Sequence, residues 1–213
     1  MSKYDYDEVA AYQESRRQSF LIPGEHVLWS AKPKKNAFVA NKILGMMPIA
    51  LLWLAFDGFF IANMIGSDMG GMGIFMIFFF ALHLMPVWIW LSNVLTANRR
   101  WKNTMYYVTD KRVLIQTGFL SADLQTIYYK DIRNIDLRIG LADKLLGVGD
   151  VHFDLGLYTS KGKARTKAFL DIENPHEAYT RIQSIVLNIQ TDMEYPNAYR
   201  PEENPGYNTQ YRG

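Results

Sequence analysis

Two long apolar segments constrain this chain of 213 residues more than any other feature of its sequence. The first, residues 43–65, contains one charged residue, Asp57, and the second, residues 72–95, has a single ionisable side chain, His83. A helix that crosses the hydrocarbon core of a bilayer needs roughly 20 apolar residues. Buried helices of soluble proteins are usually shorter and keep a polar face. The pattern therefore predicts two transmembrane helices, 43–65 and 72–95.

The charges that flank these segments predict the orientation of the resulting helical hairpin. The short connector, residues 66–71, forces the two helices to run antiparallel and has neither Lys nor Arg. Lysines precede the first segment, and Arg99, Arg100 and Lys102 follow the second. Because short cytoplasmic loops carry an excess of Lys and Arg, we expect both termini in the cytoplasm and the hairpin tip outside. Residues 1–20 are polar, and the first forty residues lack the apolar region of a signal peptide.

After the second segment, the pattern changes to the two-residue alternation that is typical of β-strands. We expect strands at 104–109, 112–117, 123–129, 132–137, 150–158 and 163–172 and a short helix at 140–147. Asp110 and Lys111 separate the first two strands as a hairpin turn would. Upstream of the apolar segments, residues 26–30 alternate weakly and predict a short strand. Whether that strand joins the others is left open.

The region after the last predicted strand favours one amphipathic helix. Asn174 is suited to the N-cap, Pro175 to the first position and Glu177 to a capping box. The apolar residues that recur at helical spacing are Tyr179, Ile182, Ile185, Val186 and Ile189, which place one apolar face against the sheet. Residues 191–213 are rich in Pro, Asn, Gly and Tyr without periodicity, and we expect them to be disordered.

Four short segments, taken in order, resemble the two-span bacterial PH-like (pleckstrin-homology-like) domain membrane proteins. They are Gly24–Pro33; Tyr106 or Tyr107 with Val108, Thr109, Arg112 and Gly118; Ile132 with Ile135; and Leu145, Leu146, Gly147 and Gly149. The resemblance covers roughly residues 22–190. It implies a β-rich PH-like barrel capped by one C-terminal α-helix, a membrane anchor in the bacterial inner membrane, and no enzymatic reaction.

The expected organisation is therefore a polar segment, a membrane hairpin and a cytosolic domain. Residues 1–20 are polar, 21–42 hold a short strand and a basic pre-membrane segment, 43–95 form the hairpin, 101–190 the PH-like domain, and 191–213 the tail. The absence of cysteine excludes disulfides, thiolate metal sites and a cysteine nucleophile. No metalloprotease, serine-hydrolase or P-loop motif is present, and a net charge of +2 gives no sign of nucleic-acid binding. We expect no catalytic residue, metal or cofactor.

Two sets of polar residues are candidate sites. Lys161, Lys163, Arg165 and Lys167 are spaced by two, which places all four on one side of a strand. They would contact anionic headgroups or a protein partner, or they form a solvated edge that resists strand pairing. Asp57 and His83 lie at similar depths in the two apolar segments. They would form a proton or ion path or a contact to a second subunit, or they join the two helices of one hairpin.

Two functions follow from these alternatives. In the first, the protein is a non-catalytic PH-like module that the hairpin tethers to the inner face of the membrane, where it binds a protein partner or lipid headgroups. In the second, it is a subunit of a membrane transport or envelope-stress assembly, or of a homo-oligomer, with the hairpin as the interface. Neutralising the four cations would abolish the first function, whereas Asp57→Leu would abolish the second.

Overall fold

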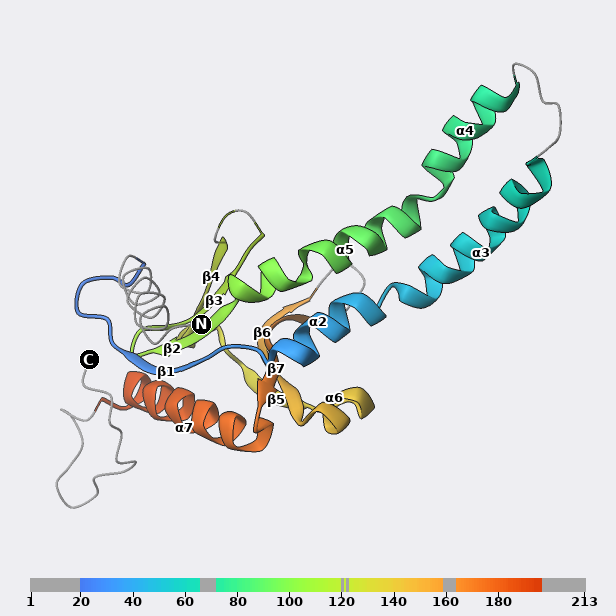
Figure 1. The fold of residues 1–213 in the computed structure, drawn as a ribbon. Coiled ribbons are helices and arrows are strands. Elements are labelled where there is room, and N and C mark those ends of the chain that lie inside the picture. The colour runs from blue at the N-terminus through green and yellow to red at the C-terminus, as the bar shows by residue number, and fades with distance from the viewer. Residues whose placement is uncertain (1–19, 66–71, 120, 122, 159–163, 197–213) are drawn as a thin grey trace, which may run out of the picture.

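A helical hairpin projects from a domain built of two antiparallel sheets and a C-terminal helix in this computed structural model (Figure 1). The structure describes residues 20–65, 72–119, 121, 123–158 and 164–196. The prediction for residues 1–20 and most of the predicted tail therefore lie outside the described residues.

The first sheet contains four strands in sequence order. These are β1 (Val27–Ala31), β2 (Met105–Thr109), β3 (Arg112–Thr117) and β4 (Asp123–Tyr128). The weak alternation at 26–30 is thus a true strand, and β1 pairs antiparallel with β2 although the whole hairpin lies between them in the chain. β1 is consequently an edge strand of the domain, joined to it by a long-range pairing.

The second sheet contains three strands and completes the two-sheet domain. It consists of β5 (Asn134–Arg138), β6 (Val148–Tyr158) and β7 (Ala164–Glu173), again in sequence order. A 3₁₀ turn, η1 (Tyr129–Asp131), connects β4 to β5, and the short helix α6 (Leu141–Leu146) connects β5 to β6. The core lies between the sheets, where Tyr106 stacks on Phe169 at 4.7 Å between ring centroids.

Helix α7 (Pro175–Glu194) covers the core on the side of the domain away from the hairpin (Figure 1). The predicted apolar face is the buried one, with Ile182, Ile185, Val186 and Ile189 in the core. The predicted capping box was wrong: Asn174 has a left-handed backbone (φ 47°) and its side chain makes no cap hydrogen bond. A side-chain N-cap normally needs an extended backbone. The helix also continues to Glu194, into the segment predicted to be disordered.

The hairpin consists of four helices. They are α2 (Lys35–Leu44), α3 (Met47–Met64), α4 (Met72–His83) and α5 (Met85–Lys102). At its base, α2 and α5 lie side by side (Figure 1), held by the indole N–H groups of Trp90 and Trp101, which donate to the carbonyls of Ile43 and Pro33. Residues 35–42, predicted only as a basic approach to the membrane, are therefore helical, because this helix packs against α5.

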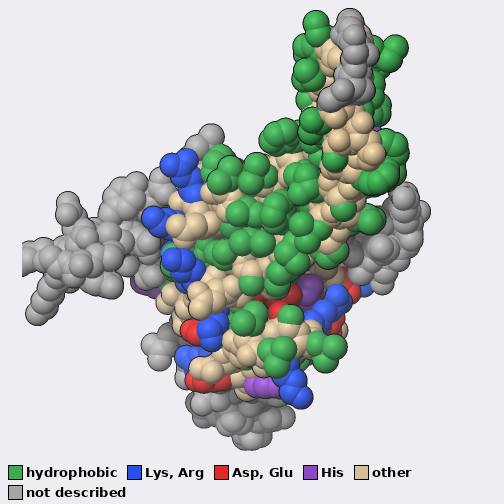
Figure 2. Space-filling model, turned by 45° about the vertical axis from the view of Figure 1, so that its right-hand side comes forward, with side chains coloured by type: hydrophobic (Ala, Val, Ile, Leu, Met, Phe, Trp, Pro, Cys, Tyr) green, Lys and Arg blue, Asp and Glu red, His purple; other side chains and the backbone are tan. Residues whose placement is uncertain are grey.

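Length and composition qualify one helix, Lys35–Met64, to cross a membrane among the described residues. The pair Met72–His83 and Met85–Lys102 adds a second span if its two helices act as one, with a bend of 52° between them. Pro86 lies at the start of α5, and proline both lacks an N–H and clashes with the preceding turn, which accounts for the break. Hydrophobic side chains cover the hairpin in Figure 2. The two transmembrane helices stay a prediction.

Candidate functional site

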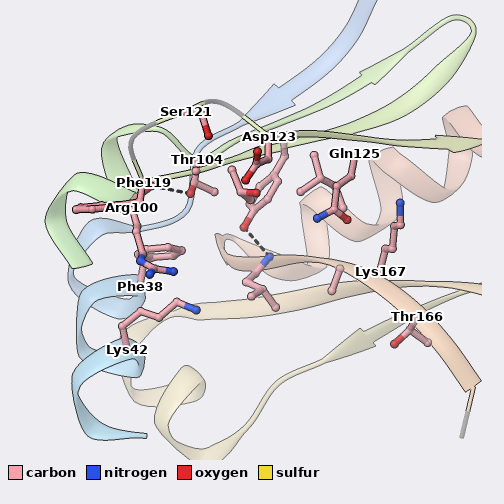
Figure 3. A pocket seen from close by; sticks show the side chains of 16 residues that line it. Phe38, Lys42, Arg100, Thr104, Phe119, Ser121, Asp123, Gln125, Thr166 and Lys167 are labelled. Carbon is pink, nitrogen blue, oxygen red and sulfur yellow. Dashed lines mark hydrogen bonds between the residues drawn. The ribbon is translucent and has the colours of Figure 1, made fainter. Parts of the chain in front are cut away.

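A cavity of about 610 Å³ opens where the base of the hairpin meets the two sheets (Figure 3). Helix α2 contributes Phe38 and Lys42. The last turn of α5 contributes Arg100, and Thr104 follows shortly after the end of that helix. The remaining wall comes from β2, β3, β4, β7 and the turn between β3 and β4. This volume lies within the range of small-molecule sites, roughly 300–1,000 Å³. Segments far apart in the chain thus build one compartment.

Cations dominate the charge of this cavity. Lys42 and Arg100 lie at one end and Lys167 at the other (Figure 3), and Asp123 on β4 is the acidic residue among the described lining residues. The guanidinium of Arg100 lies 5.9 Å from the ring of Phe119, and its Nε donates to Thr96. These contacts hold a charged group beside the opening while leaving it partly exposed.

Neutral groups complete the wall and favour a ligand with both polar and apolar parts. Phe38, Tyr106 and Phe119 supply aromatic surface, and Thr166 and Ser121 supply hydroxyl groups. The Tyr106 hydroxyl accepts a hydrogen bond from the Leu170 N–H at 3.1 Å, which is drawn in Figure 3. Burial raises the pKa of Tyr106 strongly, so this hydroxyl stays neutral. The lining thus combines cations, hydroxyl groups and aromatic surface.

The predicted cluster of four cations is described only in part. Lys161 and Lys163 lie outside the described residues, as does the side chain of Arg165. Lys167 lies on the same face of β7 as the fully buried Phe169, because alternate residues share a face. Its ammonium donates to the Thr126 carbonyl on β4 at 3.2 Å. Lys167 therefore bridges the two sheets at the cavity.

In the sequence, the Lys and Arg residues that flank the apolar segments, Lys42 and Arg100 among them, predict only the orientation of the hairpin in the membrane. A signal for their proximity is present in the sequence, because an antiparallel hairpin brings the residues before its first helix close to those after its second. What no local pattern revealed is that Lys167, from β7, meets the same cavity.

Asp57 and His83, the other candidate pair, contact each other directly. His83 Nδ1 lies 2.7 Å from Asp57 Oδ1, and Asp57 is fully buried between α3 and the α4–α5 pair. Phe79 stacks on the His83 ring at 5.2 Å, and the Trp53 indole donates to the His83 carbonyl. The two residues are therefore joined within one hairpin and within one chain.

A third polar cluster joins α2 to β7. Asn41 on α2 donates to Asp171 Oδ1 at 2.6 Å, and the Lys34 N–H donates to the Asp171 carbonyl. The Asp171 N–H in turn donates to Asp150 on β6. Burial, and then the nearby charge of Asp150, raise the pKa of Asp171 to about 6. This cluster is a joint between the hairpin and the domain.

No three His, Asp or Glu side chains come together as a metal site would require within the described ranges. A family model described as a bacterial PH domain matches residues 49–186. The match takes in nearly all of α3, the whole of α4 and α5, six of the seven strands and most of α7. Comparisons with curated proteins and with solved structures gave no match.

Proposed function

This chain belongs to the bacterial PH domain family, and from that premise we propose that it is a non-catalytic binding module held at the inner face of the membrane by its helical hairpin. The apolar surfaces of α3 and α4 support the anchor, since their large side chains are mostly exposed in the isolated chain. In a bilayer these side chains would contact lipid tails. The excess of Lys and Arg at the base of the hairpin supports a cytoplasmic domain.

The observation that carries the binding role is the cavity at the base of the hairpin. Lys42 and Arg100 border it and also flank the apolar segments, so an anchored protein would hold both at the level of the lipid headgroups. Each cation near an anionic leaflet contributes about 1 kcal/mol to lipid attraction. We propose that the cavity binds the phosphate of an anionic phospholipid, with Lys42 and Arg100 as its principal contacts and Lys167 as a further one.

Apolar lining favours a lipid over a free anion. Phe119 is partly exposed beside Arg100, where it would contact the glycerol and the upper acyl chain of a bound lipid, and Phe38 is buried beside Lys42. A free phosphate would leave this surface unused. A bound lipid would also join α2, the β3–β4 turn and β7, which all line the cavity.

The alternative function, a subunit whose hairpin is an assembly interface, has less support. It would use Asp57 and His83 for contacts with another chain. These two side chains bond to each other instead, and Asp57 is fully buried within its own hairpin.

Native mass spectrometry of the purified full chain in detergent tests the proposal. The protein is titrated with phosphatidylglycerol, with phosphatidylcholine and with glycerol 3-phosphate. We expect one phosphatidylglycerol to bind in preference to phosphatidylcholine, and the Lys42→Gln, Arg100→Gln, Lys167→Gln triple variant to bind it at least about tenfold more weakly. The matched control removes three cations elsewhere, Lys111→Gln, Lys130→Gln and Arg181→Gln, and should bind normally.

Either of two results would contradict the proposed ligand. Equal retention of phosphatidylglycerol by the triple variant and the wild type would show that the cavity cations do not contribute. Equal binding of glycerol 3-phosphate and phosphatidylglycerol would show that the site recognises a free phosphate rather than a lipid.

A further inference from the structure

Two leucines on α6 are the most exposed large hydrophobic side chains in the described part of the chain. Leu141 is 88% exposed and Leu145 is 90% exposed. Residues four apart lie on the same face of a helix, so the two side chains form one apolar surface. A single exposed leucine needs no explanation, but two adjacent ones displayed on a projecting helix indicate a contact surface.

Helix α6 is held firmly in spite of its shortness. The Gly140 N–H donates to Asp143 Oδ2 at 3.0 Å at its start. At its end, Gly147 has φ 65°, a left-handed conformation that glycine adopts at little cost. The leucines are therefore presented by an ordered element rather than by a loose loop.

The position of α6 indicates what covers these leucines. Lys34, the residue before α2, donates to the Leu146 carbonyl at 3.1 Å and ties α6 to the foot of the hairpin. In Figure 1, α6 projects from the domain on the same side as α3 and α4. That side is turned toward the viewer in Figure 2, where hydrophobic side chains cover the hairpin and its base and charged side chains lie among smaller hydrophobic patches on the domain below. Helix α6 and its leucines thus lie near the foot of the hairpin.

The charged residues around α6 also favour a lipid surface as the partner of these leucines. Arg138 precedes α6 and Lys144 lies on it, and both are exposed. The acidic residue of this helix, Asp143, already accepts the cap hydrogen bond from Gly140. Leucines that are flanked by exposed cations match the interfacial region of an anionic leaflet, where apolar faces insert about 5–10 Å.

We propose that α6 is a second membrane contact, in which Leu141 and Leu145 insert into the interfacial region of the bilayer that the hairpin crosses. This inference rests on the proposed membrane anchor. A hairpin alone leaves the domain free to tilt and rotate about its base. A second contact fixes the domain against the membrane and holds the cavity at one depth relative to the headgroups.

The absence of cysteine from the chain permits a direct test with single-cysteine variants. The full chain is reconstituted into phosphatidylglycerol–phosphatidylcholine nanodiscs after labelling Leu141→Cys or Leu145→Cys with an environment-sensitive fluorophore. Lipids with a spin label just below the headgroup act as quenchers. Leu187→Cys on α7, 53% exposed, is the control outside the membrane, and Leu52→Cys on α3, 69% exposed, is the control within it.

We expect the labels at 141 and 145 to be quenched at least twofold more than the label at 187. Quenching at 52 with none above the level of 187 at either leucine would overturn the α6 contact and leave the anchor intact. No quenching at 52 would refute the anchor itself and, with it, this inference. Self-quenching of the α6 labels that grows with the number of chains per disc would assign the surface to a second copy and would also overturn the proposal.

Discussion

At the residue scale, the most informative contact is a buried ion pair between Glu25 and Arg112. Arg112 donates from Nε and Nη2 to the two carboxylate oxygens of Glu25 at 2.9 and 3.0 Å. Thr109 donates to the same carboxylate at 2.7 Å. Glu25 precedes β1, whereas Thr109 and Arg112 bracket the β2–β3 turn. The threonine and arginine of the resemblance motif therefore have a structural role: they attach the N-terminal segment to the first sheet.

We predict that Glu25→Gln lowers the free energy of unfolding by about 2 kcal/mol at pH 7, because it leaves Arg112 without its charged partner. Burial raises the pKa of Glu25, but the hydrogen bonds from Arg112, Ile22 and Thr109 outweigh it and hold the pKa below 4.5. The contribution is therefore present above pH 4.5 and is lost as the pH falls through the lower folded-state pKa. Urea unfolding of the full chain in detergent, followed by circular dichroism, measures this.

The wild type and Glu25→Gln should converge in stability at low pH. The exposed Glu177→Gln on α7 is the control and should change stability by less than about 0.5 kcal/mol. A constant difference between wild type and Glu25→Gln from pH 3 to pH 7 would show that the ionised carboxylate is not the stabilising species.

Asp171 gives the opposite pH dependence. Its pKa is raised to about 6 by burial and by Asp150, so Asp171 binds a proton more readily in the folded protein than in the unfolded chain. The cost of the buried charge grows from about pH 4 to pH 6 and is complete above pH 6. We predict that Asp171→Asn stabilises the domain by about 1–2 kcal/mol at pH 7 and not at all at pH 3.5.

Asparagine suits this position because its carbonyl can still accept from Asn41 and because it tolerates φ 56°. Thermal unfolding at the two pH values measures the change, with the exposed Asp131→Asn as the control. A destabilisation at pH 7 would indicate that the charged form of Asp171 is needed at the joint with α2.

At the element scale, the Asp57–His83 contact joins α3 to α4, and its two partners differ in burial. The Asp57 side chain is fully buried, and its second oxygen, Oδ2, has no hydrogen-bond partner in the structure, whereas the His83 side chain is 31% exposed. Losing the histidine therefore leaves a buried carboxyl group without a partner. Losing the aspartate leaves an imidazole that is less deeply buried, at 31% exposure, and so loses less.

We predict that His83→Leu destabilises the hairpin by about 1–3 kcal/mol and does so more than Asp57→Leu. The double variant should be more stable than His83→Leu alone, since it removes the unpaired carboxyl as well. The measurement is the temperature at which each detergent-solubilised variant leaves the monodisperse peak in size-exclusion chromatography. Additive losses in the double variant would mean that the two side chains act independently of each other.

At the scale of the whole molecule, the flanking charges predict which side of the membrane each part occupies. With both ends of the hairpin cytoplasmic, a thiol reagent that cannot cross membranes should label Ile65→Cys at the outer end of α3 in spheroplasts. Ser184→Cys on α7 should be labelled only after the membrane is permeabilised. Labelling of both positions, or of Ser184→Cys alone, in intact spheroplasts would contradict the proposed orientation.

The sequence allowed the local elements of this molecule to be predicted but not how they meet. Alternation located β2, β3 and β6, and helical spacing identified the buried face of α7, because both patterns reflect burial of neighbouring side chains. The β1–β2 pairing was left open and the Glu25–Arg112 pair was missed, because in both cases the partners lie on opposite sides of the hairpin in the chain. The cavity was missed for the same reason, since α2, α5 and β7 supply its cations.

Because the hairpin lies between β1 and β2 in the chain, the first sheet cannot be completed until the hairpin has been synthesised. Ala31 pairs with Tyr106, so residues 32–105 must be synthesised before the first strand can meet its neighbour. At typical bacterial translation rates this delay is roughly 4–15 s. During that interval the helices leave the ribosome while the sheet is still open. On the proposed topology, the hairpin would enter the membrane first, and the cytosolic domain would fold afterwards at its base.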